Sequence, residues 1–231
     1  MSIAANLEQV RNEVADACAR AGRSPTEVAL MAVSKVHPAE ALLEAYAAGQ
    51  RLFGENRVQE FAGKAAEFVW AVDDAPRVHL IGPLQNNKTG KAAELFDAVD
   101  TLDSVKTAGR LNEAAAVLGK MIPVLVEIKL SHEESKHGLA PDALPEFLKA
   151  LAGLANLRVS GLMTVPPWSE DAETARPYFQ HLRRLRDESL KEYPGMTELS
   201  MVMSNDFRVA IEEGSTTVRV GTAIFGKRVI A

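Results

Sequence analysis

Lys35 is a residue whose type and position could do chemistry. It follows the apolar run 28–33 and Ser34, and it precedes Pro38, where a helix can begin. At the edge of a buried sheet an amine loses hydration, which lowers its pKa and leaves a neutral nucleophile that can condense with an aldehyde. A lysine that only reaches from a strand end into solvent is the commoner case. Lys35 is therefore a candidate Schiff-base lysine, and its position alone favours the plainer alternative.

Groups suited to a phosphate lie near the other end of the chain. Gly221 and Thr222 lie within the segment 218–226, the predicted last strand and its exit, where they supply backbone amides and a hydroxyl, and Ser204 adds a donor after the preceding apolar run. Barrels of parallel strands often seat a phosphate in the loops after their last two strands, where backbone N–H groups face the anion. The alternative is that these are turn residues that close the barrel.

The segment Gly82–Thr89 (GPLQNNKT) is close to a phosphate-binding P-loop but lacks its second glycine. Asn87 restricts the wrap of the backbone, and Pro83 lacks an N–H donor. We interpret the segment as a barrel loop whose Asn and Lys side chains cap a helix or line the mouth of a site. A P-loop nucleotide hydrolase that depends on Lys88 remains an alternative.

Short apolar runs alternate with helical patterns along the whole chain, as they do in βα proteins. The runs lack strict polar alternation, which is typical of parallel strands buried on both faces. Eight βα units in 231 residues favour an α/β fold, a single (β/α)8 TIM barrel over residues 1–231 with an extra N-terminal helix. We expect strands over 28–33, 52–54, 78–81, 98–102, 123–128, 159–165, 199–203 and 218–225, and helices over 3–18, 38–48, 58–70, 103–118, 141–155, 171–193 and 204–213.

Composition excludes several classes of protein. A net charge of −5 with scattered Lys and Arg argues against a nucleic-acid partner. The single Cys18 cannot form an intramolecular disulfide, and no stretch approaches 18 uninterrupted apolar residues. The spacing of His132 and His137 does not match a zinc site, and we expect no metal. We therefore expect a soluble cytoplasmic protein without a membrane segment.

Several motifs, in order and nearly end to end, resemble the YggS/PROSC-type pyridoxal 5'-phosphate (PLP) homeostasis proteins. This family is related to the barrel domain of bacterial alanine racemases. The motifs are AVSKVHP, AYAAGQRLFGENRVQE, HLIGPLQNNK, EESKHGL, GLMTVPP and LSMVMSNDFRVAIEEGSTTVRVGTAIFG.

The resemblance implies that Lys35 holds PLP covalently as a Schiff base. It implies that Arg219 faces the pyridine nitrogen, where an arginine cannot deliver a proton as a carboxylic acid would. The ring is then a weaker electron sink, which disfavours decarboxylation and transamination. The remaining cofactor-binding residues that the resemblance implies are Asn56, Ser200 and Met203 beside the cofactor, and Ser204, Gly221 and Thr222 near its phosphate.

The chain departs from the family pattern at three positions. Val202 stands where members usually have glycine, Asn205 where they have aspartate and Ser160 where they have arginine. Val202 could narrow the pocket, whereas Asn205 removes only one capping charge. None of these departures touches Lys35.

Racemisation needs two bases, and the related racemases take the second from an additional domain of a partner subunit. Because this chain ends just after the last barrel strand, we expect a monomeric PLP carrier or buffer in vitamin B6 homeostasis, without catalytic residues or efficient turnover. PLP-dependent apo-enzymes are its expected recipients. A slow PLP-dependent amino-acid racemase is the alternative. Lys136, after the fifth strand, is a candidate secondary contact for PLP.

Overall fold

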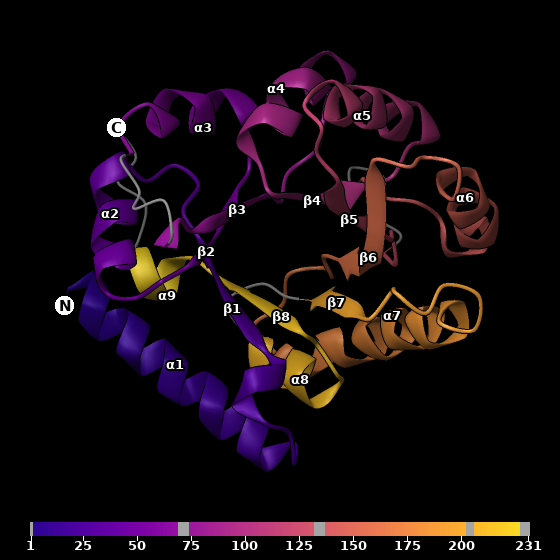
Figure 1. The fold of residues 1–231 in the computed structure, drawn as a ribbon. Helices are drawn as coiled ribbons and strands as arrows, with labels where there is room; N and C mark the ends of the chain where they lie inside the picture. The colour runs from indigo at the N-terminus through magenta and orange to yellow at the C-terminus, as the bar shows by residue number, and fades with distance from the viewer. Residues whose placement is uncertain (1, 69–73, 132–136, 202–205, 227–231) are drawn as a thin grey trace.

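The eight strands form a closed parallel barrel in a computed structural model, which describes residues 2–68, 74–131, 137–201 and 206–226. Each strand pairs with the next along the chain, and β8 pairs with β1 (Figure 1). This arrangement confirms the predicted α/β TIM-barrel class. The strands are β1 (Ala29–Val33), β2 (Leu52–Glu55), β3 (Arg77–Leu80), β4 (Ala98–Leu102), β5 (Ile122–Glu127), β6 (Leu157–Thr164), β7 (Glu198–Met201) and β8 (Thr217–Val220).

Helices surround the barrel and return the chain from one strand to the next (Figure 1). Short 3-10 turns lead into several of them, so the predicted helices over 141–155 and 171–193 begin as 3-10 turns at Pro141–Ala143 and Ala172–Ala175. No helix in the described ranges is long and apolar enough to cross a membrane. The helices are α1 (Ile3–Arg20), α2 (Ala39–Ala47), α3 (Val58–Ala65), α4 (Thr89–Leu95), α5 (Val105–Val117), α6 (Leu144–Leu151), α7 (Arg176–Ser189), α8 (Phe207–Glu212) and α9 (Thr222–Phe225).

The extra N-terminal helix α1 is present and contacts α2, α8 and α9 (Figure 1). Its apolar residues recur at helical spacing, and Leu7, Val10 and Val14 are buried. The Ser2 hydroxyl accepts a hydrogen bond from the Ala5 amide and caps the first turn. Cys18 lies in the same buried stripe.

The two faces of each strand meet different surroundings. The residues that face the helices, such as Phe53, Val99 and Leu199, belong to one continuous apolar core. The alternate residues point into the barrel. There Gly54 lies so close to Met31 that an added Cβ would come within 2.8 Å of its sulfur. Polar groups enter this inner layer as well, and they include the fully or nearly fully buried Asp100, Ser200 and Arg219.

The predicted last strand, 218–225, is too long. Strand β8 ends at Val220, and residues Thr222–Phe225 form the short helix α9. Apolar residues resume at Ala223, Ile224 and Phe225 directly after Gly221 and Thr222, so hydrophobic periodicity could not place this boundary. The chain turns at Gly221, where an added Cβ would lie 3.2 Å from the Val33 carbonyl oxygen, and this close approach favours a glycine.

Candidate functional site

Lys35 lies in the tight loop that leaves β1. Ser34 before it is fully buried, and Val36 after it has a φ of 62°, which makes it the one non-glycine residue with positive φ in the described ranges. A β-branched residue adopts this left-handed conformation only at a cost in free energy. The backbone on both sides of Lys35 is therefore held by its surroundings.

A buried ion-pair network holds this loop against β2 and α3. The Lys64 ammonium donates to the Ser34 carbonyl oxygen at 3.2 Å, to Glu55 Oε1 at 3.1 Å and to Glu60 Oε1 at 2.9 Å. The Ser34 hydroxyl donates to Glu55 Oε1 at 2.7 Å, and the Val36 amide donates to Glu60. Both residues that flank Lys35 are thus tied to the same cluster.

The two carboxylates of this network differ in their electrostatics. Burial raises the pKa of Glu55, and the charge of Lys64 and the Ser34 hydroxyl offset only part of that rise. Partial burial alone would raise the pKa of Glu60, but hydrogen bonds from Lys64 and the Val36 amide hold it below its usual value. Glu60 is therefore the firmer anionic partner of Lys64, and Glu55 accepts a proton more easily.

The second strand delivers Asn56 to the same end of the barrel. It follows the last residue of β2 directly and is partly buried. Gly82, which follows β3, packs so tightly on it that an added Cβ would lie 2.1 Å from the Asn56 carbonyl oxygen. The Gly82 carbonyl oxygen in turn accepts a hydrogen bond from the Thr101 hydroxyl at 2.8 Å. The start of the segment resembling a P-loop therefore packs against Asn56 at this end of the barrel.

Arg219 is a buried cation inside the barrel, on β8. It is 6% exposed and donates to the Thr164 carbonyl oxygen at 3.3 Å. Burial lowers the pKa of its guanidinium, and the carboxylates of Asp100, Glu127 and Asp206 oppose that effect. These three acids make the charge tolerable in the interior.

Ser200, on the neighbouring strand β7, is fully buried, and its hydroxyl has no hydrogen-bond partner among the described residues. An unsatisfied buried hydroxyl is uncommon in native proteins. Like Arg219, it occupies a strand position inside the barrel.

Gly221 and Thr222 join the end of β8 to α9, next to the Lys35 loop. The first amides of a helix have no partner inside the helix and favour an anion. The ring of His37 stacks on Phe225 of α9, with the ring centroids 5.0 Å apart. The Asn6 amide of α1 donates to the Ile224 carbonyl oxygen at 2.9 Å. These contacts fasten the last loop of the barrel to the first.

The structure thus brings Lys35, Asn56, Gly221 and Thr222 to one end of the barrel, with Ser200 and Arg219 in its interior. Met203 and Ser204, with Val202 and Asn205, lie outside the described residues, as does Lys136. Sequence reasoning missed Glu55, Glu60 and Lys64. A carboxylate at the end of the otherwise apolar strand LFGE was the signal that could have revealed them.

The P-loop alternative gains no support from the contacts of Asn86. The Asn86 side chain accepts a hydrogen bond from Thr107 at 3.2 Å and its carbonyl oxygen accepts one from Thr89 at 3.2 Å, so this part of the segment holds helices together. Within the ranges that the structure describes, no group of three or more His, Cys, Asp or Glu side chains could hold a metal ion.

The chain forms a closed parallel barrel with a lysine after its first strand and a buried arginine on its last strand. Residues 5–229 match the alanine racemase N-terminal domain family, and the chain belongs to it. Within that family it belongs to the pyridoxal phosphate homeostasis proteins. The protein of that name from Escherichia coli strain K12 is 44% identical, and the one from Vibrio alginolyticus is 42% identical. Each alignment covers 98% of this chain, and 97% and 98% of the two relatives respectively.

Solved structures agree with this assignment. PipY of Synechococcus elongatus PCC7942, solved with PLP bound, is 40% identical and superposes with a TM-score of 0.85 over 97% of this chain and 100% of its own. Alanine racemase of Clostridium difficile 630 is 15% identical, with a TM-score of 0.74 over 99% of this chain and 57% of its own. The second likeness shows the shared barrel fold alone.

Proposed function

We propose that this chain binds PLP at the carboxyl end of its barrel, holds it as a Schiff base on Lys35, and acts as a carrier or buffer in PLP homeostasis. The observation that carries the proposal is the convergence of Lys35, Arg219 and the Gly221–Thr222 turn on the adjacent strands β1 and β8. The names of the curated relatives and the PLP bound in PipY support it. We assign the role to one domain over residues 1–231.

The residues present fit this cofactor. When bound, PLP supplies an aldehyde that condenses with an amine and a pyridine ring that withdraws electrons. Lys35 would provide the amine, and its strained, clamped loop orients it. Gly221 and Thr222 would bind the phosphate through amides and a hydroxyl, with Ser204 as a further donor. Ser200, whose buried hydroxyl has no other described partner, Asn56 and Met203 would line the pocket.

Arg219 favours retention of PLP over turnover. A guanidinium can donate a hydrogen bond toward the pyridine nitrogen, but it does not transfer a proton there. The ring then stabilises a carbanion poorly, so Arg219 would anchor the cofactor without activating it as an electron sink. The relatives' shared name specifies homeostasis and no catalysed reaction, which accords with a carrier.

Borohydride reduction followed by peptide mapping tests the attachment. The purified holoprotein is expected to carry the visible absorbance of a Schiff base, and reduction should fix a pyridoxyl group on the peptide that contains Lys35. Lys35→Ala should lose the absorbance, whereas Lys91→Ala, at an exposed position on α4, should keep it. A pyridoxyl group on another lysine, or full absorbance in Lys35→Ala, would overturn the proposal.

The slow racemase is tested on the same preparation. The holoprotein is incubated with single L-amino acids, and the D-isomers are measured by chiral chromatography. A carrier should produce no sustained increase of D-isomer above a Lys35→Ala control. Continued formation of D-isomer that depends on Lys35 would replace the carrier with the enzyme.

The cellular context completes the proposal. The chain would act as a cytoplasmic monomer that passes PLP to apo-enzymes by releasing it from Lys35. Mixing the holoprotein with a PLP-dependent apo-enzyme should activate the enzyme faster than a control that receives only the free PLP recovered by ultrafiltration of the same holoprotein preparation. Equal rates would mean that no direct transfer takes place.

A further inference from the structure

A cavity of about 260 Å³ lies at the end of the barrel opposite the Lys35 loop. Its walls come from the amino-terminal parts of the strands, from their first to fourth residues, whereas the proposed PLP site follows the carboxyl ends of the strands. The volume is below the ~300–1,000 Å³ of sites for drug-sized ligands, and suits a small metabolite. The strand residues at this end include Ala29, Leu52, Arg77, Ala98, Pro123, Arg158, Glu198 and Thr217.

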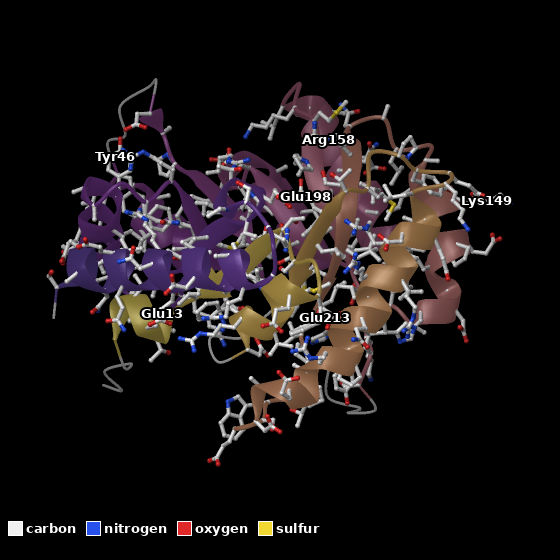
Figure 2. The ribbon with its side chains drawn as sticks, turned by 90° about the horizontal axis from the view of Figure 1, so that it is seen from below. Glu13, Tyr46, Lys149, Arg158, Glu198 and Glu213 are labelled. Carbon is white, nitrogen blue, oxygen red and sulfur yellow. The ribbon has the colours of Figure 1, made fainter. Side chains whose placement is uncertain are left out.

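Two guanidiniums stand at the rim of the cavity. Arg77 opens β3 and Arg158 is the second residue of β6, and both are exposed. Neither guanidinium makes a hydrogen bond or ion pair with a side chain in the described ranges, although both lie in the electrostatic field of Glu198. Figure 2 shows Arg158 and Glu198 near each other at the barrel. Such a pair of cations at an opening attracts a carboxylate.

The inner part of the cavity presents acceptors. Asp100 is 1% exposed; its Oδ1 lies 3.1 Å from His79 Nδ1, while its Oδ2 is buried without a hydrogen-bond partner. Glu198 is partly buried, and burial together with the charge of Asp100 raises its pKa. A buried carboxylate oxygen without a donor is costly, and an N–H group placed beside it would relieve that cost.

The wall between rim and interior is apolar. Leu52, Ala98 and Leu125 line it and are buried, and Ser160 adds only a short side chain. The cavity therefore has three parts: cations at its opening, carboxylates inside and an aliphatic wall. A phosphate would satisfy the cations but would also meet Asp100 and Glu198, and a simple cation would leave both arginines without a partner.

We propose that this cavity binds a small apolar α-amino acid, with its carboxylate at Arg77 and Arg158 and its ammonium group toward Asp100 and Glu198. The aliphatic side chain packs on Leu52 and Leu125. This is a site separate from the PLP site, and it does not depend on Lys35.

Backbone-amide NMR on the holoprotein tests the proposal, with L-valine, isovalerate and isobutylamine as probes. The last two lack the ammonium and the carboxylate of valine, respectively. L-Valine should produce saturable shifts at residues 77–80, 98–100, 158–160 and 198–200, and each truncated probe should bind at least about tenfold more weakly, because a charge-assisted contact is lost. A Lys35→Ala chain should give the same shifts at this end, so failure of the PLP proposal is seen separately.

Variants locate the two charges. Arg158→Gln and Glu198→Gln should each raise the Kd for L-valine about tenfold or more, whereas Arg184→Gln, an exposed arginine on α7, should leave it unchanged. Circular dichroism and the spectrum of the free variant verify the fold. The proposal would be overturned if L-valine produced no saturable shifts at the four segments, if isovalerate bound as tightly as L-valine, or if all three variants had equal Kd values.

Discussion

At the scale of single residues, the loop after β1 concentrates backbone strain beside the proposed PLP lysine. Val36 holds a left-handed conformation although its side chain is 57% exposed and gains little from burial. Strain of this kind persists only where neighbouring contacts enforce it. Here the Val36 amide donates a hydrogen bond to Glu60, which also accepts one from Lys64.

Val36→Gly should therefore raise the free energy of unfolding by about 1 kcal/mol, because glycine adopts positive φ without steric cost. Urea unfolding measured by circular dichroism tests this. The matched control is Val117→Gly at the end of α5, where the valine is 87% exposed and helical, and where glycine should be destabilising by up to ~1 kcal/mol. A loss of stability in both variants would show that Val36 is unstrained.

The raised pKa of Glu198 predicts a dependence of stability on pH. The carboxyl group is harder to ionise in the folded state than in the unfolded chain, so its contribution to stability is fully present below pH 4.5 and is lost as the pH rises through the higher folded pKa. Glu198→Gln does not ionise. The difference in free energy of unfolding, variant minus parent, should thus increase from pH 4 to pH 7 in urea titrations; a constant or decreasing difference would contradict the shift.

At the scale of elements, one lysine joins β1, β2 and α3. The side chain of Lys64 is 11% exposed and that of Glu55 is completely buried, so the pair lies inside the protein. A buried ion pair contributes little compared with apolar packing, but removal of one partner leaves an uncompensated charge. The network is therefore expected to hold the geometry of the Lys35 loop more than to add stability.

Lys64→Met should lower the free energy of unfolding at neutral pH by about 3 kcal/mol, and it should slow the binding of PLP because the Lys35 loop loses its anchor. Chemical denaturation and stopped-flow absorbance measure the two effects. Lys91→Met removes the solvent-exposed pair with Glu94 and should change stability by less than about 0.5 kcal/mol. If the two variants behave alike, the network does not position the loop.

At the scale of the whole molecule, closure of the barrel gathers residues from different strands at each of its two ends. Strands β1 and β8 are the first and last along the chain, and their pairing sets Arg219 opposite Met31 and brings Gly221 next to the end of β1, where the Lys35 loop begins. The opposite ends of the same strands surround the cavity with Arg77 and Glu198. Asp100 lies inside the barrel and contributes to the electrostatic field of groups toward both ends, His79 on one side and Arg219 on the other.

Because PLP would bind only the closed barrel, it should stabilise the whole chain. At a free concentration of 100 times its Kd, PLP should add about 2.7 kcal/mol to the free energy of unfolding and raise the Tm. Differential scanning calorimetry with and without PLP measures this increase. Lys35→Ala should show a much smaller increase, and an unchanged one would mean that the lysine contributes nothing to affinity.

The eight βα units, the N-terminal helix and the positions of Lys35 and Asn56 near strand ends could be read from the amino-acid sequence alone. Apolar periodicity and turn residues are local properties of the chain, so they predict strands and helices without knowledge of the tertiary structure. The end of β8 was misplaced because apolar residues resume in α9 directly after the turn at Gly221 and Thr222. Only the tertiary structure decided that Lys64 clamps the Lys35 loop, and that Arg77, Asp100, Arg158 and Glu198 surround one cavity. Those residues come from separate strands, and only closure of the barrel brings them together.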